Sequence, residues 1–163
     1  MPTKMREVQR PRGLLRLGFR LPIWLFRFHL GWLLGERFLL LTHKGRKSGL
    51  PHQTVLEVLQ HTRADDIYYV FSGWGAHADW VRNVEQAQDV RLIVGTRSTQ
   101  AHAWRISAEE AVPIILDYVR RHPIAIRVLP RLMGYQVDGT EADFRAFVHL
   151  GVVVAFHSTP SSS

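Results

Sequence analysis

Residues 42–54 read Thr-His-Lys-Gly-Arg-Lys-Ser-Gly-Leu-Pro-His-Gln-Thr, and apolar residues flank this stretch on both sides. Three leucines occupy positions 39–41, and positions 55–59 are apolar apart from Glu57. Two apolar runs joined by a polar segment that contains glycine are typical of a strand, a turn and a second strand. The sequence therefore predicts a β-hairpin whose turn lies within residues 42–54.

The predicted turn carries groups that bind anions. Its two glycines, Gly45 and Gly49, allow backbone amides to converge on one point, and charged or hydroxyl side chains surround them. A phosphate or a polycarboxylate is the ligand that this chemistry favours. A solvated basic hairpin tip is the alternative, and the spacing alone does not separate the two because short basic motifs also occur by chance. The side chains concerned are Lys44, Arg46, Lys47, Ser48 and Thr54.

The composition indicates a single globular domain. The chain has 163 residues, of which 46% are hydrophobic and 21% charged, as expected for a folded protein with a substantial core. It has no cysteine, which excludes a disulfide framework and a thiolate metal site. Arg12, Arg16 and Arg20 interrupt the first apolar stretches, so no signal peptide is expected and the predicted location is cytoplasmic.

The positive charge is concentrated near the N-terminus. Residues 1–35 hold seven lysines and arginines against Glu7 alone, so they carry +6 of the formal net charge of +7. The remainder is nearly neutral and shows no zinc finger, helix-turn-helix or aromatic RNA-binding motif. Nucleic acid is therefore not an expected partner.

Residues 13–34 have the pattern of an amphipathic helix. Arg16, Arg20 and Arg27 fall on one narrow stripe at 100° per residue, and bulky apolar residues occupy the rest of the surface. Three arginines argue against a membrane-spanning segment. Two interpretations stay open: the helix lies in a membrane interface, at the inner face of the membrane, or it packs on the rest of the protein.

The order of elements predicts an α+β fold. Strands in hairpins with separate helices favour a small barrel of about six mainly antiparallel strands with flanking helices. Three parts are expected: a basic leader with the amphipathic helix at 1–36, a closed or split β-barrel at 37–157, and a disordered tail at 158–163. Further strands are predicted at 67–71, 90–94, 101–106 and 152–156, a short helix at 77–84, and a helix from a capping box at 107–110 to residue 121.

Several motifs together resemble one known family. Leu-Leu-Thr-His-Lys-Gly-Arg-Lys-Ser-Gly-Leu-Pro at 40–51 is followed by Val-Phe-Ser-Gly-Trp-Gly at 70–75 and by Trp-Val-Arg-Asn at 80–83. This combination, with the last strand at 152–156, resembles the deazaflavin-dependent nitroreductases, also called deazaflavin-dependent quinone reductases. The resemblance implies a barrel of the FMN-binding split-barrel type. It also implies an enzyme that uses the reduced deazaflavin coenzyme F-420 as hydride donor to a quinone, a nitroaromatic or an activated enone.

The resemblance also implies where the cofactor binds. The Gly-Arg-Lys turn would grip the phosphate and carboxylate tail, the serine at the end of the third strand would lie against the deazaflavin ring, and the Trp-x-x-Asn helix would close the pocket. The predicted cofactor-binding residues are Lys44, Gly45, Arg46, Lys47, Ser48, Gly49, His52, Thr54, Phe71, Ser72, Gly73, Trp74, Trp80 and Asn83.

Two differences from the family pattern bear on the cofactor. Gly73 stands where a lysine is common, and His77-Ala-Asp79 replaces the usual Asn-Pro. FMN or haem as cofactor, or non-enzymatic binding of a lipid or tetrapyrrole at the membrane surface, are therefore the alternatives. A monomer and a homodimer are both compatible with the sequence.

No catalytic side chain is assigned from the sequence. Hydride transfer from a deazaflavin needs the protein mainly to position ring and acceptor, and the proton could come from water, His77 or Tyr135. His43, His52 and His61 recur at nine-residue spacing, but no regular helix or strand period brings them together, so no metal site is expected.

Overall fold

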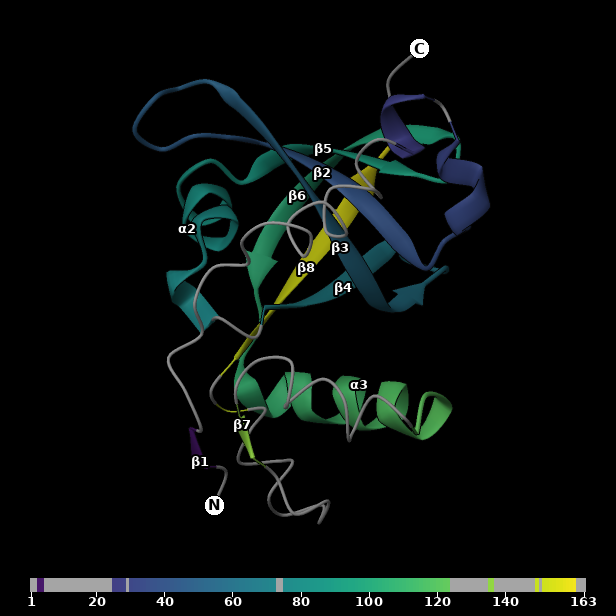
Figure 1. Ribbon diagram of the computed structural model, residues 1–163, viewed down its shortest axis with the longest axis vertical. Coiled ribbons are helices and arrows are strands. Elements are labelled where there is room, and N and C mark those ends of the chain that lie inside the picture. Colours follow the sequence, from purple (N-terminus) through teal and green to yellow (C-terminus); the bar gives the residue numbers. More distant parts are fainter. Residues whose placement is uncertain are drawn as a thin grey trace.

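The computed structural model describes residues 3–4, 25–28, 30–72, 75–123, 135–136, 149 and 151–160. Six of its strands form a closed antiparallel barrel in the order β2-β3-β4-β8-β6-β5 (Figure 1). This confirms the predicted α+β fold and its six-stranded barrel. The barrel strands are β2 (Phe38–Lys44), β3 (Pro51–Thr62), β4 (Ile67–Ser72), β5 (Asp89–Val94), β6 (Arg97–Arg105) and β8 (Val152–Thr159).

Helices and short elements surround the barrel. In Figure 1, α3 runs beneath the barrel, and α2 lies beside it, below the loop that joins β2 to β3. Residues 25–27 form one helical turn within the predicted helix 13–34, while residues 13–24 and 29 lie outside the described residues. The elements are η1 (Gly31–Leu34), η2 (Gly75–His77), α2 (Asp79–Gln86), α3 (Ala108–Arg121) and the paired two-residue strands β1 (Thr3–Lys4) and β7 (Tyr135–Gln136).

The barrel interior holds the main hydrophobic core, and α2 belongs to it. Strand β5 illustrates how the strands contribute to this core. Val90, Leu92 and Val94 are buried and alternate with exposed or half-buried residues, as expected for a strand with one face in the core. Val81 and Val84 of α2 join the same buried cluster. The helix that was predicted to carry Trp80 and Asn83 is thus fixed to the barrel by its apolar face.

A second hydrophobic core lies between the outer face of the barrel and α3. Ile115 and Val119 of this helix pack with Leu59 of β3 and Val153 of β8. Tyr118 donates a hydrogen bond from its hydroxyl to the Glu57 carboxylate. Burial, and after it this hydrogen bond, raises the pKa of Tyr118 to about 12, so the phenol stays protonated.

The last strand is longer than the sequence pattern indicated. Ser158 and Thr159 belong to β8, so the described chain remains ordered in the sheet past the predicted start of the tail at 158. Ser158 is buried, and its Oγ lies 2.8 Å from Oγ1 of Thr99 on β6. The two hydroxyl groups form a hydrogen bond with each other. Because each has a partner, both can be buried between the strands at the end of β8.

The capping box of α3 gives a first testable prediction. The Glu110 amide donates to Ser107 Oγ (3.2 Å), and the Ser107 amide donates to Glu110 Oε2 (2.9 Å). We expect Ser107→Ala to lower the free energy of unfolding by about 1 kcal/mol. Ser107→Asp, which keeps an acceptor, should lose much less. Urea denaturation measures both, and an Ala variant as stable as the wild type would contradict the assignment.

Candidate functional site

The β2–β3 turn is closed by its own backbone. The strands pair from Phe38 with Glu57 to Lys44 with Pro51, which leaves residues 45–50 as the turn. Within it the Gly45 amide donates to the Leu50 carbonyl (2.8 Å) and the Gly49 amide donates to the Gly45 carbonyl (2.9 Å). Gly49 has φ of 69°, a left-handed conformation that glycine adopts without strain.

Gly45 matters for a different reason, which is the space that a side chain would take from Ser48 and His52. A Cβ atom at this position would lie 2.5 Å from Ser48 Oγ and 2.7 Å from His52 Nε2. Neither separation is a normal van der Waals contact. The absence of a side chain therefore lets Ser48 and His52 approach each other across the turn, with 3.4 Å between Oγ and Nε2.

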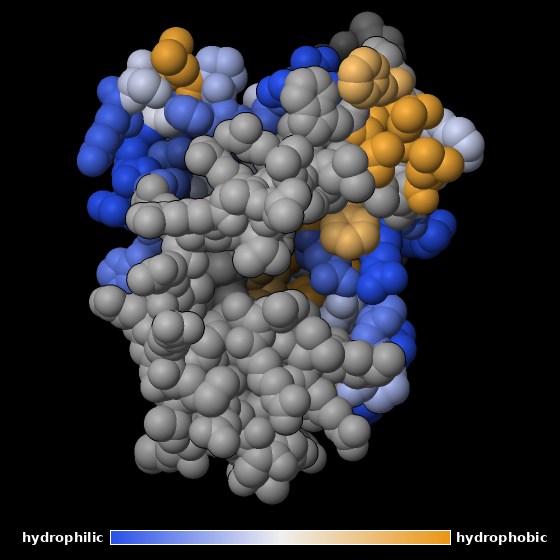
Figure 2. All heavy atoms as spheres, in the orientation of Figure 1, coloured by the Kyte–Doolittle hydropathy of each residue, from blue (hydrophilic) through white to orange (hydrophobic). Residues whose placement is uncertain are grey.

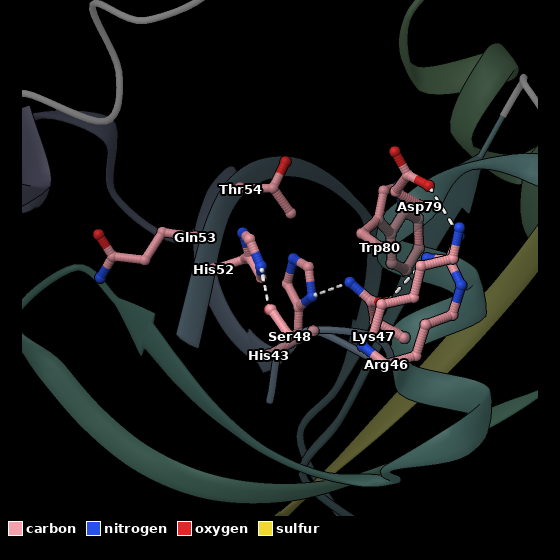
Figure 3. A pocket seen from close by; sticks show the side chains of 11 residues that line it. His43, Arg46, Lys47, Ser48, His52, Gln53, Thr54, Asp79 and Trp80 are labelled. Atoms are coloured by element: carbon pink, nitrogen blue, oxygen red, sulfur yellow. Dashed lines mark hydrogen bonds and ion pairs between the residues drawn. The ribbon is translucent and has the colours of Figure 1, made fainter. Parts of the chain in front are cut away.

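A cavity of about 550 Å³ lies between this turn, the start of β3 and α2 (Figure 3). Its volume is in the range of pockets that hold small molecules and cofactors. Figure 3 shows side chains of the hairpin on one side and of α2 on the other, with Arg46 reaching across to the helix. The lining residues are His43, Gly45, Arg46, Lys47, Ser48, His52, Gln53, Thr54, Asp79, Trp80 and Asn83.

Asn83 joins the hairpin to α2. It is 5% exposed, and its Oδ1 accepts two hydrogen bonds from Arg46, one from the backbone amide (3.1 Å) and one from Nη1 (2.9 Å). Its Nδ2 donates to Nδ1 of His43 at 3.0 Å. A buried amide whose oxygen and nitrogen are both bonded has one defined orientation. Asn83 thereby fixes the position of the basic turn over the helix.

His43 is held as a neutral imidazole. Burial, followed by the charge of His52, lowers its pKa to about 4, although the nearby Asp79 carboxylate acts in the opposite direction. Since Nδ1 accepts the hydrogen bond from Asn83, the proton of the neutral ring lies on Nε2. Pairing between strands, which is not a period within one element, makes His43 and His52 direct partners in the hairpin, with ring centroids 5.9 Å apart.

The three cations in and next to the turn, Lys44, Arg46 and Lys47, have different environments. Arg46 is nearly buried, its side chain 16% exposed, and its Nη2 donates to Asp79 Oδ1 at 3.1 Å. Lys44 and Lys47 are exposed, and within the described part of the chain no hydrogen bond or ion pair forms at either ammonium group. The arginine therefore organises the turn, while the lysines keep their charge available to a ligand.

Trp80 forms the apolar wall of the cavity. It is half-buried, lies on α2, and its ring stacks on Phe156 of β8 with centroids 6.4 Å apart. Because Phe156 is fully buried in the barrel core, Trp80 connects that core to the cavity. A large aromatic wall beside a cluster of cations suits a ligand with one flat apolar part and one charged part.

The structure brings together eight of the fourteen predicted site residues. The assignment of all fourteen to cofactor binding stays a prediction. Lys44 ends β2 and Gly49 lies in the turn, and neither lines the cavity; Gly73 and Trp74 lie outside the described residues. The eight that line it are Gly45, Arg46, Lys47, Ser48, His52, Thr54, Trp80 and Asn83.

Phe71 and Ser72 lie elsewhere in the fold. Phe71 packs against the core beneath α3, and Ser72 is buried at the end of β4, where its hydroxyl donates to the Gly75 carbonyl at 3.2 Å. Three further lining residues were missed: His43, Gln53 and Asp79. The hairpin register would have placed His43 opposite His52, but only once the length of the turn was known.

A comparison with protein families identifies the chain. Residues 29–128 match the family described as F420H2-dependent quinone reductases. The chain belongs to this family. The match confirms the resemblance found in the motifs, and with it an oxidoreductase that depends on the reduced deazaflavin coenzyme F420.

Two solved structures of low sequence identity show the same fold. An F420-H2 dependent reductase, FDR-A, is 18% identical with a TM-score of 0.52, over 76% of this chain and 96% of that one. A structure described as a domain-swapped dimer is also 18% identical with a TM-score of 0.52, over 83% and 99%. Atu2129 of Agrobacterium tumefaciens is 22% identical with a TM-score of 0.48, over 83% of this chain and 63% of that one. Curated proteins give no significant sequence match.

The depressed pKa of His43 predicts a pH-dependent stability. The unfolded chain takes up a proton on this imidazole below pH 6.5, whereas the folded chain does so only near pH 4. The free energy of unfolding that His43 contributes therefore falls as the pH drops from 6.5 to about 4. Glutamine does not titrate, so His43→Gln lacks this pH-dependent contribution to the free energy of unfolding. Urea denaturation at several pH values should show the difference in free energy of unfolding between wild type and variant becoming smaller from pH 6.5 to about 4. If the free energies of the two proteins change in parallel with pH, the prediction is refuted.

Proposed function

We propose that the cavity holds the phosphate and carboxylate tail of reduced coenzyme F420, and that the enzyme passes a hydride from this cofactor to a small quinone. Nitroaromatics and activated enones are further acceptors of the same chemical type. The observation that supports the proposal is the set of cations at the cavity: Arg46 is fixed by α2, and the Lys47 ammonium group at the lining has no partner among the described residues.

The donors of the turn fit such an anionic tail. Ser48 and His52 add side-chain donors beside Lys47. Within the described residues, the backbone amides of Lys47 and Ser48 have no hydrogen-bond partner, whereas the amides of Gly45, Arg46 and Gly49 are all used. Unpaired amides next to cations form the kind of concave site that binds phosphate and carboxylate groups.

The residues of the cavity bind and orient rather than exchange protons. The bound deazaflavin supplies the hydride, so the protein must place ring and acceptor and keep water away. His43 supports Asn83 through its Nδ1 and stays neutral, so it acts as a structural partner. His77 is exposed and does not line the cavity, which favours bulk water as the proton source.

Two cation variants test the proposal. We expect Lys47→Ala to weaken binding of oxidised F420 by roughly tenfold, since a hydrogen bond to a charged group contributes about 1.5–3 kcal/mol and this one is partly screened by solvent. It should leave stability unchanged. Arg46→Ala should lower both affinity and stability, because it also removes the bonds to Asn83 and Asp79.

Fluorescence titration with oxidised F420, and in parallel with FMN, measures the affinities. Arg120→Ala, an exposed residue of α3 far from the cavity lining, is the control with the same change in charge. Equal affinity of wild type and Lys47→Ala would contradict the assignment of the tail site. If the protein binds FMN in preference to F420, the cofactor assignment changes to FMN.

The apolar surface near residue 30 supports a membrane contact at the inner face. Hydrophobic side chains gather over the segment that includes η1 (Figure 2), and they are strongly exposed: Phe28 by 67%, Trp32 by 57% and Leu33 by 56%. Among the described residues, no helix has both the length and the apolar character needed to cross a bilayer. An exposed apolar patch that follows a basic segment in the sequence is typical of proteins that lie on an anionic membrane surface.

Vesicle flotation tests this contact. We expect the double variant Trp32→Ser, Leu33→Ser to float with anionic phospholipid vesicles at least fivefold less than wild type, because it removes two large exposed apolar side chains from the patch. Leu50→Ser removes an equally exposed leucine from the tip of the β2–β3 turn and serves as the control. Equal flotation of all three proteins would exclude the contact.

A further inference from the structure

Arg46 presents one edge of its guanidinium that is only partly used. Nη1 donates to Asn83 Oδ1, which is buried, while Nη2 donates to Asp79 Oδ1, which belongs to a carboxylate that is 67% exposed. Within the described part of the chain, Nε has no hydrogen-bond partner. The Nε and Nη2 atoms form the side edge that binds carboxylate or phosphate groups with two parallel hydrogen bonds. Asp79 occupies half of that edge.

Asp79 also lines the cavity. It opens α2 one residue before Trp80, and Figure 3 shows its carboxylate beside the Arg46 guanidinium. Because the Asp79 side chain is 67% exposed, solvent screens this ion pair, which contributes about 1 kcal/mol, so a ligand can displace the carboxylate. The displaced carboxylate nevertheless remains on the rigid helix, close to the incoming anion.

We propose that Asp79 is a specificity-determining residue: it holds the outer edge of Arg46 until an anionic ligand group takes its place there, and its charge reduces the affinity for such groups. This inference rests on the proposed tail site and adds the residue that sets its charge selectivity. Arg46 keeps its bond to Asn83 throughout, so the guanidinium stays in position while Nε and Nη2 exchange one anion for another. The cavity binds an anionic tail well only when that tail offers more charge or more bonds than the Asp79 carboxylate.

The test compares Asp79→Asn with wild type and with a matched variant. Glu85→Gln makes the same change in net charge on the same helix, but Glu85 pairs with Arg105 and does not line the cavity. The probes are oxidised F420 and the same deazaflavin without its phosphate and carboxylate tail. We expect Asp79→Asn to bind F420 roughly tenfold more tightly, as two like charges a few ångströms apart at a protein surface imply. The gain should shrink in high salt and be absent for the tail-free probe and in Glu85→Gln.

Several results would overturn the inference. They are equal F420 affinity in Asp79→Asn and wild type, an equal gain in Glu85→Gln, or weaker binding in Asp79→Asn, which would make Asp79 a support for Arg46 alone. If F420 binds to neither protein, the proposed tail site fails.

If F420 binds to neither protein, inorganic phosphate serves as the probe for the exchange of anions at Arg46. NMR of the Arg46 Nε–H and of the Asn83 side-chain amide follows phosphate binding directly. Tighter phosphate binding in Asp79→Asn than in wild type supports the exchange at Arg46, and equal or undetectable binding in both refutes it.

Discussion

Closure of the barrel by β8 is the constraint on which the other parts of the structure depend. This strand pairs antiparallel with β4 on one side and β6 on the other, so it joins the two halves of the sheet. Its first five residues, 152–156, are all buried. One face supplies Phe156 to the barrel interior, and the other supplies Val153 to the core beneath α3. Trp80, and with it the wall of the cavity, rests on this strand.

One buried polar side chain, Asn83, joins the two parts of the site to each other on this rigid barrel. Strands β2 and β3 carry the basic turn beyond the barrel, and α2 is fixed by the hydrophobic contacts of Val81 and Val84. Asn83 connects the two with three hydrogen bonds. A turn held in this way keeps its donors in place before a ligand arrives, and this lowers the entropy cost of binding.

The sequence predicted those features that depend on neighbouring residues. Alternating and continuous apolar runs located the strands, and the capping box located the start of α3 at its first residue. The partners of Arg46 could not be predicted, because Asn83 and Asp79 lie more than thirty positions away and become neighbours only when α2 packs on the barrel. Serine and threonine at the end of β8 resemble a tail, and only the pairing with β6 shows that they belong to the wall.

The different environments of the cations show how a basic motif can hold a turn in place and still leave charge for a ligand. Arg46 has a planar group with several donors, so it can bond Asn83 and still offer an edge to a ligand. Lys47 has a flexible point charge, which suits an anion whose position varies. In an enzyme whose cofactor supplies the hydride, selection by the protein rests on such charges rather than on an acid–base pair. An acidic residue at the same cavity, Asp79, is therefore a natural means of adjusting that selection.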